Sequence, residues 1–190
     1  MKTDTAIQSA LRETARLLTE FPADQVSAVE RAGAVMAEAI RAGRKLIWFG
    51  NGGSATQSQH MAAEFVGRFQ QERRSLPSIS LTENMASVTA IGNDYAFERI
   101  FSRQLEGLAQ PGDVAVGLST SGNSPNVVQG LRAARALKLG AIGLTGGSGG
   151  KMPPMCDICI CAPSTVTARI QELHLTIGHI LCELVEAAVV

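Results

Sequence analysis

The sequence has few aromatic residues and no excess of charge of either sign. Phe, Trp and Tyr make up 4% of the 190 residues, whereas hydrophobic residues as a whole make up 45%. The core must therefore rest on Leu, Ile, Val and Ala, which suits helices on a parallel sheet better than an aromatic platform for nucleic-acid bases. Because 17 basic residues balance 17 acidic ones, we expect no nucleic-acid partner.

A long uninterrupted hydrophobic run is also missing. No stretch of about 18 apolar residues occurs, so we expect no transmembrane helix and no membrane partner. The N-terminal residues lead into an amphipathic pattern rather than the apolar stretch of a secretion signal. We therefore expect a cytoplasmic protein, and the length of 190 residues predicts a single domain, 1–190.

Cysteine is scarce, and its spacing raises one alternative. Cys156 and Cys159 form a Cys-x-x-Cys pair that could indicate a metal or redox site. The run around them, which continues to Cys161, has the apolar pattern of a strand, so alternation should point Cys156 and Cys159 apart. No second pair completes a zinc ribbon, and we interpret these residues and Cys182 as small buried hydrophobic side chains.

Helix-like and strand-like patterns alternate along the rest of the chain. Two amphipathic helices at about 4–20 and 23–42 come before the first short apolar run. Such alternation predicts an α/β fold, a flavodoxin-like three-layer sandwich with a parallel sheet flanked by helices, plus the two N-terminal helices. The predicted strands are 45–49, 78–81, 114–118, 140–144 and 158–161, and the further helices are 54–69, 97–108, 124–138 and 165–189.

Three predicted strands end in loops of Gly, Ser, Thr and Asn, which a parallel sheet collects on one edge. The loop Ser119-Thr120-Ser121-Gly122-Asn123-Ser124 carries four hydroxyl groups between a strand and a helix. Free N–H groups, the helix dipole and hydroxyl donors make such a junction an anion site. Ser124 alone would serve as an ordinary N-cap, but four hydroxyls exceed that need, so we predict a phosphate site.

The glycine-containing loops disfavour two classes of nucleotide. The serine-rich loop lacks the lysine of a Walker motif. The loop Gly50-Asn51-Gly52-Gly53-Ser54 lacks the third glycine of a dinucleotide fingerprint. These absences favour a small phosphorylated ligand over ATP or NAD.

Two pairs of polar residues have spacings that suit a metal site. His60 and Glu64 are four residues apart on a predicted helix and share a face, although such pairs are more often surface ion pairs. Gln171 and His179 are eight residues apart, about 80° around the last helix, and can converge on an ion that lies slightly off its face. His174 is about 140° from His179, and we interpret it as structural.

Taken together, these motifs resemble the phosphoheptose isomerases of the sugar-isomerase (SIS) domain family. The resemblance covers nearly the whole chain, including both N-terminal helices. One departure is that the family usually reads Ala-Asp-Ala where this chain has Thr56-Gln57-Ser58. The motifs that carry the resemblance are Gly50 to Ala55, Gln59-His60-x-x-x-Glu64, Asn93-Asp94, Ser119 to Ser124 and Thr167-Ala168-Arg169-Ile170-Gln171-Glu172-x-His174.

The resemblance implies an aldose–ketose isomerase that converts sedoheptulose 7-phosphate to D-glycero-D-manno-heptose 7-phosphate through an enediol, for lipopolysaccharide core or related glycans. It implies a homotetramer with one zinc ion per subunit. Glu64 is the candidate catalytic base and His179 the candidate acid. The implied metal ligands are His60, Glu64, Gln171 and His179. The implied substrate contacts are Asn51, Gly52, Gly53, Glu64, Asn93, Asp94, Ser119, Thr120, Ser121, Ser124 and Gln171.

The final predicted helix is apolar almost all round, which predicts burial. A single domain has little room for such a helix, so we expect it at a subunit interface, with the N-terminal helices 4–42 packing in the oligomer and active sites nearby. Two alternatives are a protein-binding module similar to bacterial replication-initiator-associating proteins and a sugar-phosphate-sensing regulatory domain. The His-Glu-Gln-His set favours the enzyme over the first, and the lack of an attached DNA-binding module disfavours the second.

Overall fold

A five-stranded parallel sheet forms the centre of the structure, a computed structural model that describes residues 3–190. Its spatial order is β2-β1-β3-β4-β5, and every neighbouring pair is parallel. The chain therefore reverses its direction of winding between β1 and β3, where open α/β sheets bind ligands. The strands are β1 (Leu46–Gly50), β2 (Ser78–Ser80), β3 (Val114–Ser119), β4 (Gly140–Gly146) and β5 (Ile158–Ala162).

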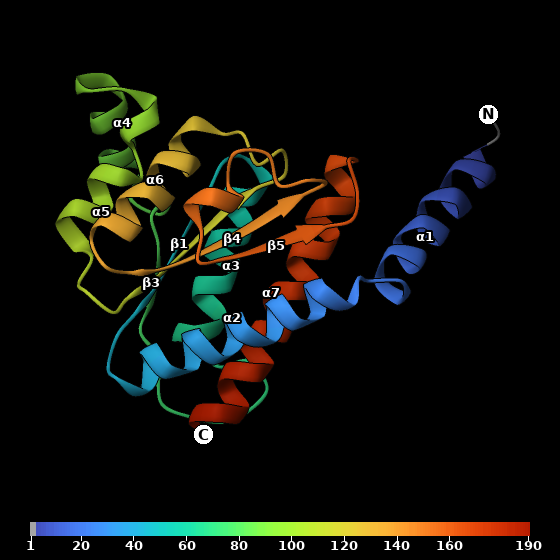
Figure 1. The fold of residues 1–190 in the computed structure, drawn as a ribbon, viewed down its shortest axis with the longest axis horizontal. Helices are drawn as coiled ribbons and strands as arrows, with labels where there is room; N and C mark the ends of the chain where they lie inside the picture. The colour runs from blue at the N-terminus through green and yellow to red at the C-terminus, as the bar shows by residue number, and fades with distance from the viewer. Residues whose placement is uncertain (1–2) are drawn as a thin grey trace.

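Helices cover both faces of this sheet, which confirms the predicted α/β sandwich (Figure 1). One face carries α2, α3 and α7, and the other carries α5 and α6. None of the helices within residues 3–190 combines the length and the hydropathy needed to cross a bilayer. The helices are α1 (Thr3–Thr19), α2 (Ala23–Arg41), α3 (Gly53–Val66), α4 (Met85–Asp94), α5 (Ser102–Leu108), α6 (Pro125–Ala136) and α7 (Thr167–Val189), with short 3-10 helices at Phe97–Arg99 and Pro153–Met155.

Alternating side chains on the buried strands divide the core into two layers. In β1, Trp48 faces the layer that contains α2, α3 and α7, and its ring lies 6.1 Å from that of Phe65. Its neighbour Phe49 faces the other layer, where its ring lies 5.1 Å from that of Phe101. Four of the eight aromatic residues are thus buried in these two layers, and aliphatic residues make up most of the remaining core.

Helix α4 is the element that the hydrophobic pattern did not predict. None of its residues is fully buried, and only Val88 and Ile91 pack partly against the core, so its apolar pattern is short. The local signal is Asn84, whose side chain accepts a hydrogen bond from the Ser87 amide at 3.1 Å and caps the helix. The predicted helix 97–108 is also interrupted, because Phe97–Arg99 forms a separate 3-10 turn before α5.

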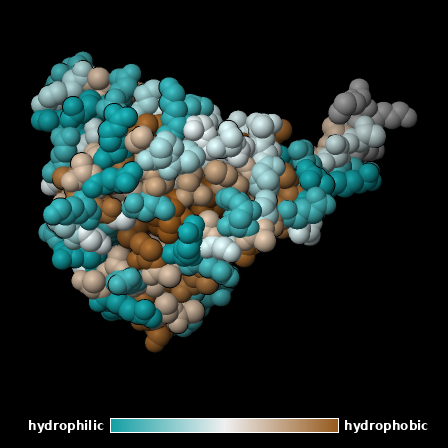
Figure 2. All heavy atoms as spheres, in the orientation of Figure 1, coloured by the Kyte–Doolittle hydropathy of each residue, from teal (hydrophilic) through white to brown (hydrophobic). Residues whose placement is uncertain are grey.

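Helix α1 projects away from the body of the molecule (Figure 1). It is attached to α7 by a 2.8 Å hydrogen bond from the Thr14 hydroxyl to Glu172 and by the buried side chain of Leu17. Its outer turns carry exposed Ile7 and Leu11 among mostly hydrophilic neighbours (Figure 2). The projecting helix therefore leaves apolar side chains without cover in a single chain.

The expectation that α7 has too little cover within one chain is wrong. Its apolar residues, including Leu173, Ile177 and Leu181, are buried under α2, α3 and the sheet. Among the large apolar side chains of α7, only Ile180 and Leu184 are more than a third exposed. The apolar character of α7 is therefore explained mainly by the chain's own core.

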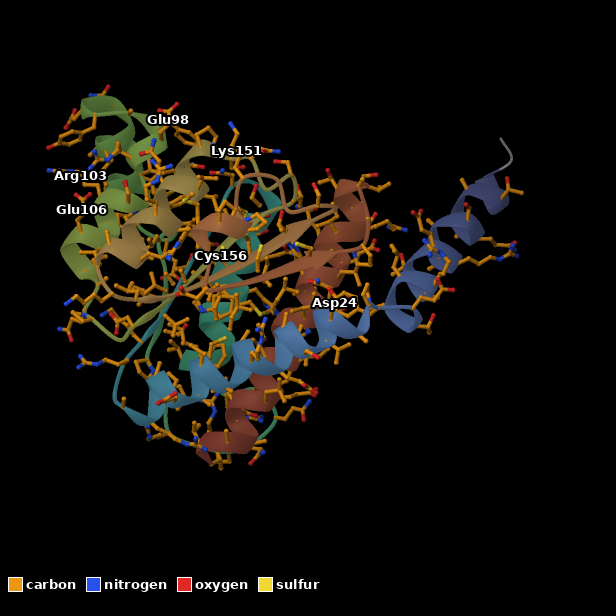
Figure 3. All side chains as sticks on the ribbon, in the orientation of Figure 1. Asp24, Glu98, Arg103, Glu106, Lys151 and Cys156 are labelled. Atoms are coloured by element: carbon orange, nitrogen blue, oxygen red, sulfur yellow. The ribbon has the colours of Figure 1, made fainter. Side chains whose placement is uncertain are left out.

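The prediction that Cys156 and Cys159 point apart is also wrong. Strand β5 begins at Ile158, so Cys156 lies in the turn before it and is free of strand alternation (Figure 3). The thiol of Cys159 is hydrogen-bonded to Cys156 and Cys161, and the first contact does most to raise its pKa, to about 12. These three half-buried thiols, unlike the buried Cys182, form one cluster.

Candidate functional site

The predicted phosphate loop lies at the carboxyl edge of the sheet and lines a pocket of about 250 Å³. Thr120 and Ser121 form one wall, and the loop that follows β4 forms the opposite wall. Ser119 and Ser124 lie at the base of the loop, with their hydroxyl oxygens 3.0 Å apart. Hydroxyls from both walls and the first turn of α7, at Thr167 and Ile170, line this space, and such groups suit an anion.

Ser124 occupies the N-cap position of α6 but does not cap the helix with its side chain. Its hydroxyl is instead paired with that of Ser119. Serine at an N-cap position usually accepts a hydrogen bond from a backbone amide of the first turn, and Ser124 does not. Neither Ser119 nor Ser124 lines the pocket at Thr120, so contact of the Ser124 hydroxyl with a ligand stays a prediction.

Gly122 gives the serine-rich loop its shape. Its φ angle is +65°, and an added Cβ would lie 1.9 Å from the carbonyl oxygen of Gly149. The Gly122 carbonyl in turn accepts a hydrogen bond from the Lys151 amide at 2.9 Å. The two walls of the pocket are thus held together by backbone contacts that only glycine permits.

The second wall of this pocket was only outlined by the sequence. The loop after β4 was expected at this edge, but its Ser148 was not predicted to line the site. Ser164, Thr165 and Thr167, which come just before or at the start of α7, were not predicted either. Their signal was a run of hydroxyl residues ahead of a helix, the same pattern that identified the first wall.

The glycine loop after β1 lies beside the phosphate loop and is tied to it. The side chains of Asn51 and Asn126 exchange two hydrogen bonds of 2.8 Å, and Asn126 is buried in the first turn of α6. Asn51 and Gly52 line a second pocket, of about 200 Å³. The loops predicted to bind substrate are therefore joined at the switch point of the sheet.

Gly53 and Gln171 are brought into contact although 118 residues separate them in the chain. A Cβ on Gly53 would lie 2.3 Å from the amide nitrogen of Gln171, so glycine is needed for this approach. Gln57, one of the residues at which this chain departs from the family pattern, also contacts Gln171. Its side-chain amide donates a 2.7 Å hydrogen bond to the Gln171 carbonyl. Helices α3 and α7 are thus joined at their N-terminal ends.

His60, Glu64 and His179 form a second cluster, two helical turns along α3 from the glycine loop. One ligand atom from each side chain lies within 4.8 Å of the others. The Nε2 atoms of His60 and His179 are 3.0 Å apart, and His60 Nε2 is 3.4 Å from the Glu64 carboxylate. The His60 side chain is 44% exposed, so the cluster is open to solvent.

This donor set fits a zinc ion. Two nitrogen ligands of a tetrahedral zinc are about 3.3 Å apart, close to the separation of the two imidazole nitrogens. Two imidazoles and a carboxylate also leave a fourth position open, as catalytic zinc sites do. The geometry of His60, Glu64 and His179 therefore agrees with three of the four predicted ligands.

Gln171 is not part of this cluster within one chain. Eight residues of helix separate it from His179, a rise of about 12 Å, and its side chain lies against Gly53. A glutamine side chain is too short to span that rise. The single chain therefore places Gln171 near the substrate loops and the other three residues further along α3 and α7.

His174 is buried beneath the phosphate pocket. Its Nε2 lies 3.0 Å from the carbonyl oxygen of Thr145, which can only accept, so Nε2 carries the proton. Burial lowers its pKa to about 4, against the opposing effect of the Thr145 hydrogen bond. His174 is thus a neutral residue that supports the end of β4, which agrees with the structural role expected for it.

Asn93 and Asp94 lie apart from the other predicted residues. Both are exposed at the C-terminal end of α4, and the Asn93 amide donates a 2.8 Å hydrogen bond to the Asp94 carboxylate. They line neither the pocket at Thr120 nor the pocket at Asn51. Within a single chain, Asn93 and Asp94 therefore lie outside both pockets and outside the His60–Glu64–His179 cluster.

Comparison with known proteins agrees with this architecture. The SIS domain family matches residues 11–146. The phosphoheptose isomerase of Rhodospirillum rubrum is 52% identical over 165 residues, which cover 87% of this chain and 88% of that protein. That of Aquifex aeolicus is 48% identical over 183 residues, 96% of each. The solved phosphoheptose isomerase of Francisella tularensis superposes with a TM-score of 0.94 at 34% identity, covering 98% of this chain and all of the other.

The chain belongs to the SIS domain family and, within it, to the phosphoheptose isomerases, a family of sugar-phosphate isomerases. The family resemblance inferred from the motifs is thereby confirmed. So is the prediction of an enzyme of the isomerase class.

Proposed function

We propose that this chain interconverts sedoheptulose 7-phosphate and D-glycero-D-manno-heptose 7-phosphate. The observation that carries the proposal is the convergence of His60, Glu64 and His179 from two helices in a chain that also has a hydroxyl-rich anion pocket. The names of its relatives point to a phosphorylated heptose. A sugar phosphate suits a hydroxyl-lined pocket in a chain that lacks the Walker motif of ATP-binding proteins and the glycine fingerprint of NAD-binding proteins.

The reaction moves one proton between C1 and C2 through an enediol, so it needs a base at carbon and an acid at oxygen. Glu64 is the proposed base and His179 the proposed acid. His60, Glu64 and His179, with Gln171 as the fourth ligand, would hold one zinc ion. Bound zinc acts as a Lewis acid that polarises the sugar carbonyl. Because Glu64 is proposed both as ligand and as base, one of its carboxylate oxygens would have to stay free of the metal to accept the proton.

The substrate phosphate is proposed to bind Ser119, Thr120, Ser121 and Ser124. Neutral hydroxyls and amides can hold a dianion there because the α6 N-terminus adds partial positive charge. Asn51, Gly52 and Gly53 would contact the sugar from the neighbouring loop. Asn93 and Asp94 are proposed to join the site from another subunit, since one chain leaves them apart.

A homotetramer is proposed because one chain is incomplete in two ways. Gln171 is about 12 Å along α7 from His179, so subunit contacts would complete the ligand set. An apolar groove of about 350 Å³ between α2 and α7 is also open to solvent beside the projecting α1. The apolar residues that would be covered include Leu18, Phe21, Val26, Ile180 and Leu184.

A coupled assay with sedoheptulose 7-phosphate tests the activity. We expect turnover with the purified chain, its loss on treatment with a chelator, and its recovery when zinc is added back. Binding of the sugar phosphate without turnover in the zinc-loaded protein would favour the sensor or protein-binding alternatives. Light scattering tests the assembly, and a monomer at micromolar concentration would contradict the homotetramer.

The proposed product suits the supply of heptose for lipopolysaccharide core or related glycans. A phosphorylated sugar of this kind is a cytoplasmic metabolite, so we propose that the enzyme works in the cytoplasm. A strain that lacks the gene for this chain should then lose heptose from its surface glycan. Complementation with the Glu64→Gln variant should fail to restore it.

A further inference from the structure

A buried ion pair lies outside the proposed ligand set. It joins α3 and α7, the two helices that carry the ligand set. The Nε atom of Arg73 lies 2.7 Å from the Glu186 carboxylate, and the two side chains are 3% and 1% exposed. The carboxylate also accepts hydrogen bonds of 3.0–3.1 Å from the amides of Phe69, Gln70 and Gln71. Burial alone would raise the pKa of Glu186, but these donors outweigh it and lower the pKa below its usual range.

The guanidinium of Arg73 extends this contact to the end of α3. Its Nη2 donates to the carbonyl of Glu64 at 2.9 Å, and its Nη1 donates to that of Phe65 at 2.9 Å. These carbonyls belong to the last turn of α3, which has no further helical partner for them. Glu186 follows His179 by seven residues and so lies on the same face of α7. One ion pair therefore fixes the C-terminal end of α3 against the helix that carries His179.

The loop held by Glu186 also brings an aromatic ring against His179. The ring of Phe69 is half-buried and stacks on the imidazole, with centroids 5.4 Å apart and planes at 24°. His179 also meets His60 edge-on, with centroids 5.3 Å apart and planes at 71°. The imidazole of His179 thus contacts two rings, and its Nε2 atom lies 3.0 Å from that of His60.

We propose that Phe69, held in place by the Arg73–Glu186 pair, is a positioning residue that orients His179 for metal binding and proton transfer. None of these three residues is proposed to contact the substrate. The inference rests on the proposed role of the His60–Glu64–His179 cluster. It adds that the segment between α3 and β2 determines the geometry of that cluster.

Phe69→Leu is the decisive variant, because it removes the ring and leaves the ion pair in place. Phe69→Tyr is the matched control, since it retains an aromatic face. Glu186→Gln weakens the Arg73–Glu186 ion pair itself. Glu106→Gln is its control, because Glu106 forms an exposed ion pair with Arg99. All four proteins and the wild-type chain are first checked by thermal unfolding, and their kinetics are compared at equal zinc content.

The primary readout is the affinity for Zn²⁺, measured by competition with a chromophoric chelator. Loss of an outer contact to a metal ligand lowers affinity by roughly 10–100-fold, and we expect this for Phe69→Leu but not for Phe69→Tyr. We expect Glu186→Gln to lower it as well and Glu106→Gln to leave it unchanged. Kinetics should show a lower kcat for Phe69→Leu with KM within roughly two-fold of wild type.

The ring signals of His179 in NMR spectra of the metal-free chain give a readout that does not depend on activity. Only three histidines are present, so the signals can be assigned by substitution. Stacking on Phe69 should shift them upfield, and Phe69→Leu should remove that shift. Unchanged zinc affinity and unchanged His179 signals in folded Phe69→Leu would overturn the inference. Absence of isomerase activity in the wild type would contradict only the proposed function, because affinity and spectra are measured without substrate.

Discussion

The phosphate pocket and the His60–Glu64–His179 cluster are built in opposite ways. The pocket consists of backbone and hydroxyl groups on loops that end neighbouring parallel strands. The cluster consists of long side chains on two helices, and a loop with a buried ion pair holds those helices together. The first site follows from the topology of the sheet, whereas the second depends on how far one helix is displaced along the other.

This difference predicts different responses to substitution. A change in the pocket should alter ligand affinity through the shape of the backbone. A change in the cluster should alter turnover, because its side chains are proposed to move the proton. Variants of each site should therefore separate KM from kcat.

Glu64→Gln is expected to have the largest effect on the cluster. The amide removes the proposed base and should lower kcat by about 10²–10⁴-fold, because that is the usual contribution of a positioned general base. Substrate binding, measured by calorimetry, should stay near the wild-type value since the phosphate pocket is unchanged. Near-normal turnover in the zinc-loaded variant would remove Glu64 from the role of base.

Gly122→Ala is the corresponding change in the pocket. The added methyl would lie 1.9 Å from the Gly149 carbonyl, and the φ of +65° adds strain, so we expect a loss of about 3 kcal/mol or more in unfolding free energy. Gly43→Ala is the control, because its φ is +72° but nothing lies within 4 Å of an added Cβ. Equal losses in urea unfolding of the two variants would show that the contact between the walls contributes nothing.

The fold and the pocket were largely predictable because their signals are local. Apolar runs followed by Gly, Ser and Thr identified β1, β3 and β4 together with the edge at which their loops meet. Helix α4 was missed since only Val88 and Ile91 pack partly against the core, which leaves a short periodic pattern. The cysteines were misread because strand alternation was extended back to Cys156, which precedes β5.

The second site was predictable in its residue types but not in its arrangement. The four-residue spacing of His60 and Glu64 can be read from the sequence, whereas the approach of His179 depends on the packing of α3 against α7. Gln171 is separated from His179 by the rise of α7 itself, about 12 Å over eight residues, which angular spacing alone did not reveal. No local pattern indicated that Phe69 would stack on His179.

A smaller effect should appear in the pH dependence of stability, through His174 below the pocket. Its pKa is about 4 in the folded chain and near 6.5 when unfolded, so only the unfolded chain binds a proton between these values. Stability should therefore fall as the pH drops from 7 to 4.5, with about 2 kcal/mol due to this residue. His174→Gln keeps a donor for Thr145 but does not titrate. Urea unfolding at both pH values should show a smaller loss for this variant, and equal losses would contradict the assignment.

The smallest expected effect separates a ligand role from a capping role at two helix N-termini. The Ser124 hydroxyl is paired with Ser119 and does not cap α6, whereas Asn84 caps α4 through the Ser87 amide. Ser124→Ala should therefore weaken substrate binding by roughly 5–10-fold, about the net contribution of one typical hydrogen bond, with unfolding free energy nearly unchanged. Asn84→Ala should lose about 1 kcal/mol of stability and keep its substrate affinity. The reverse result, with Ser124→Ala destabilised and still binding the sugar phosphate normally, would make Ser124 an ordinary cap and would leave Thr120 and Ser121 as the hydroxyl donors of the pocket.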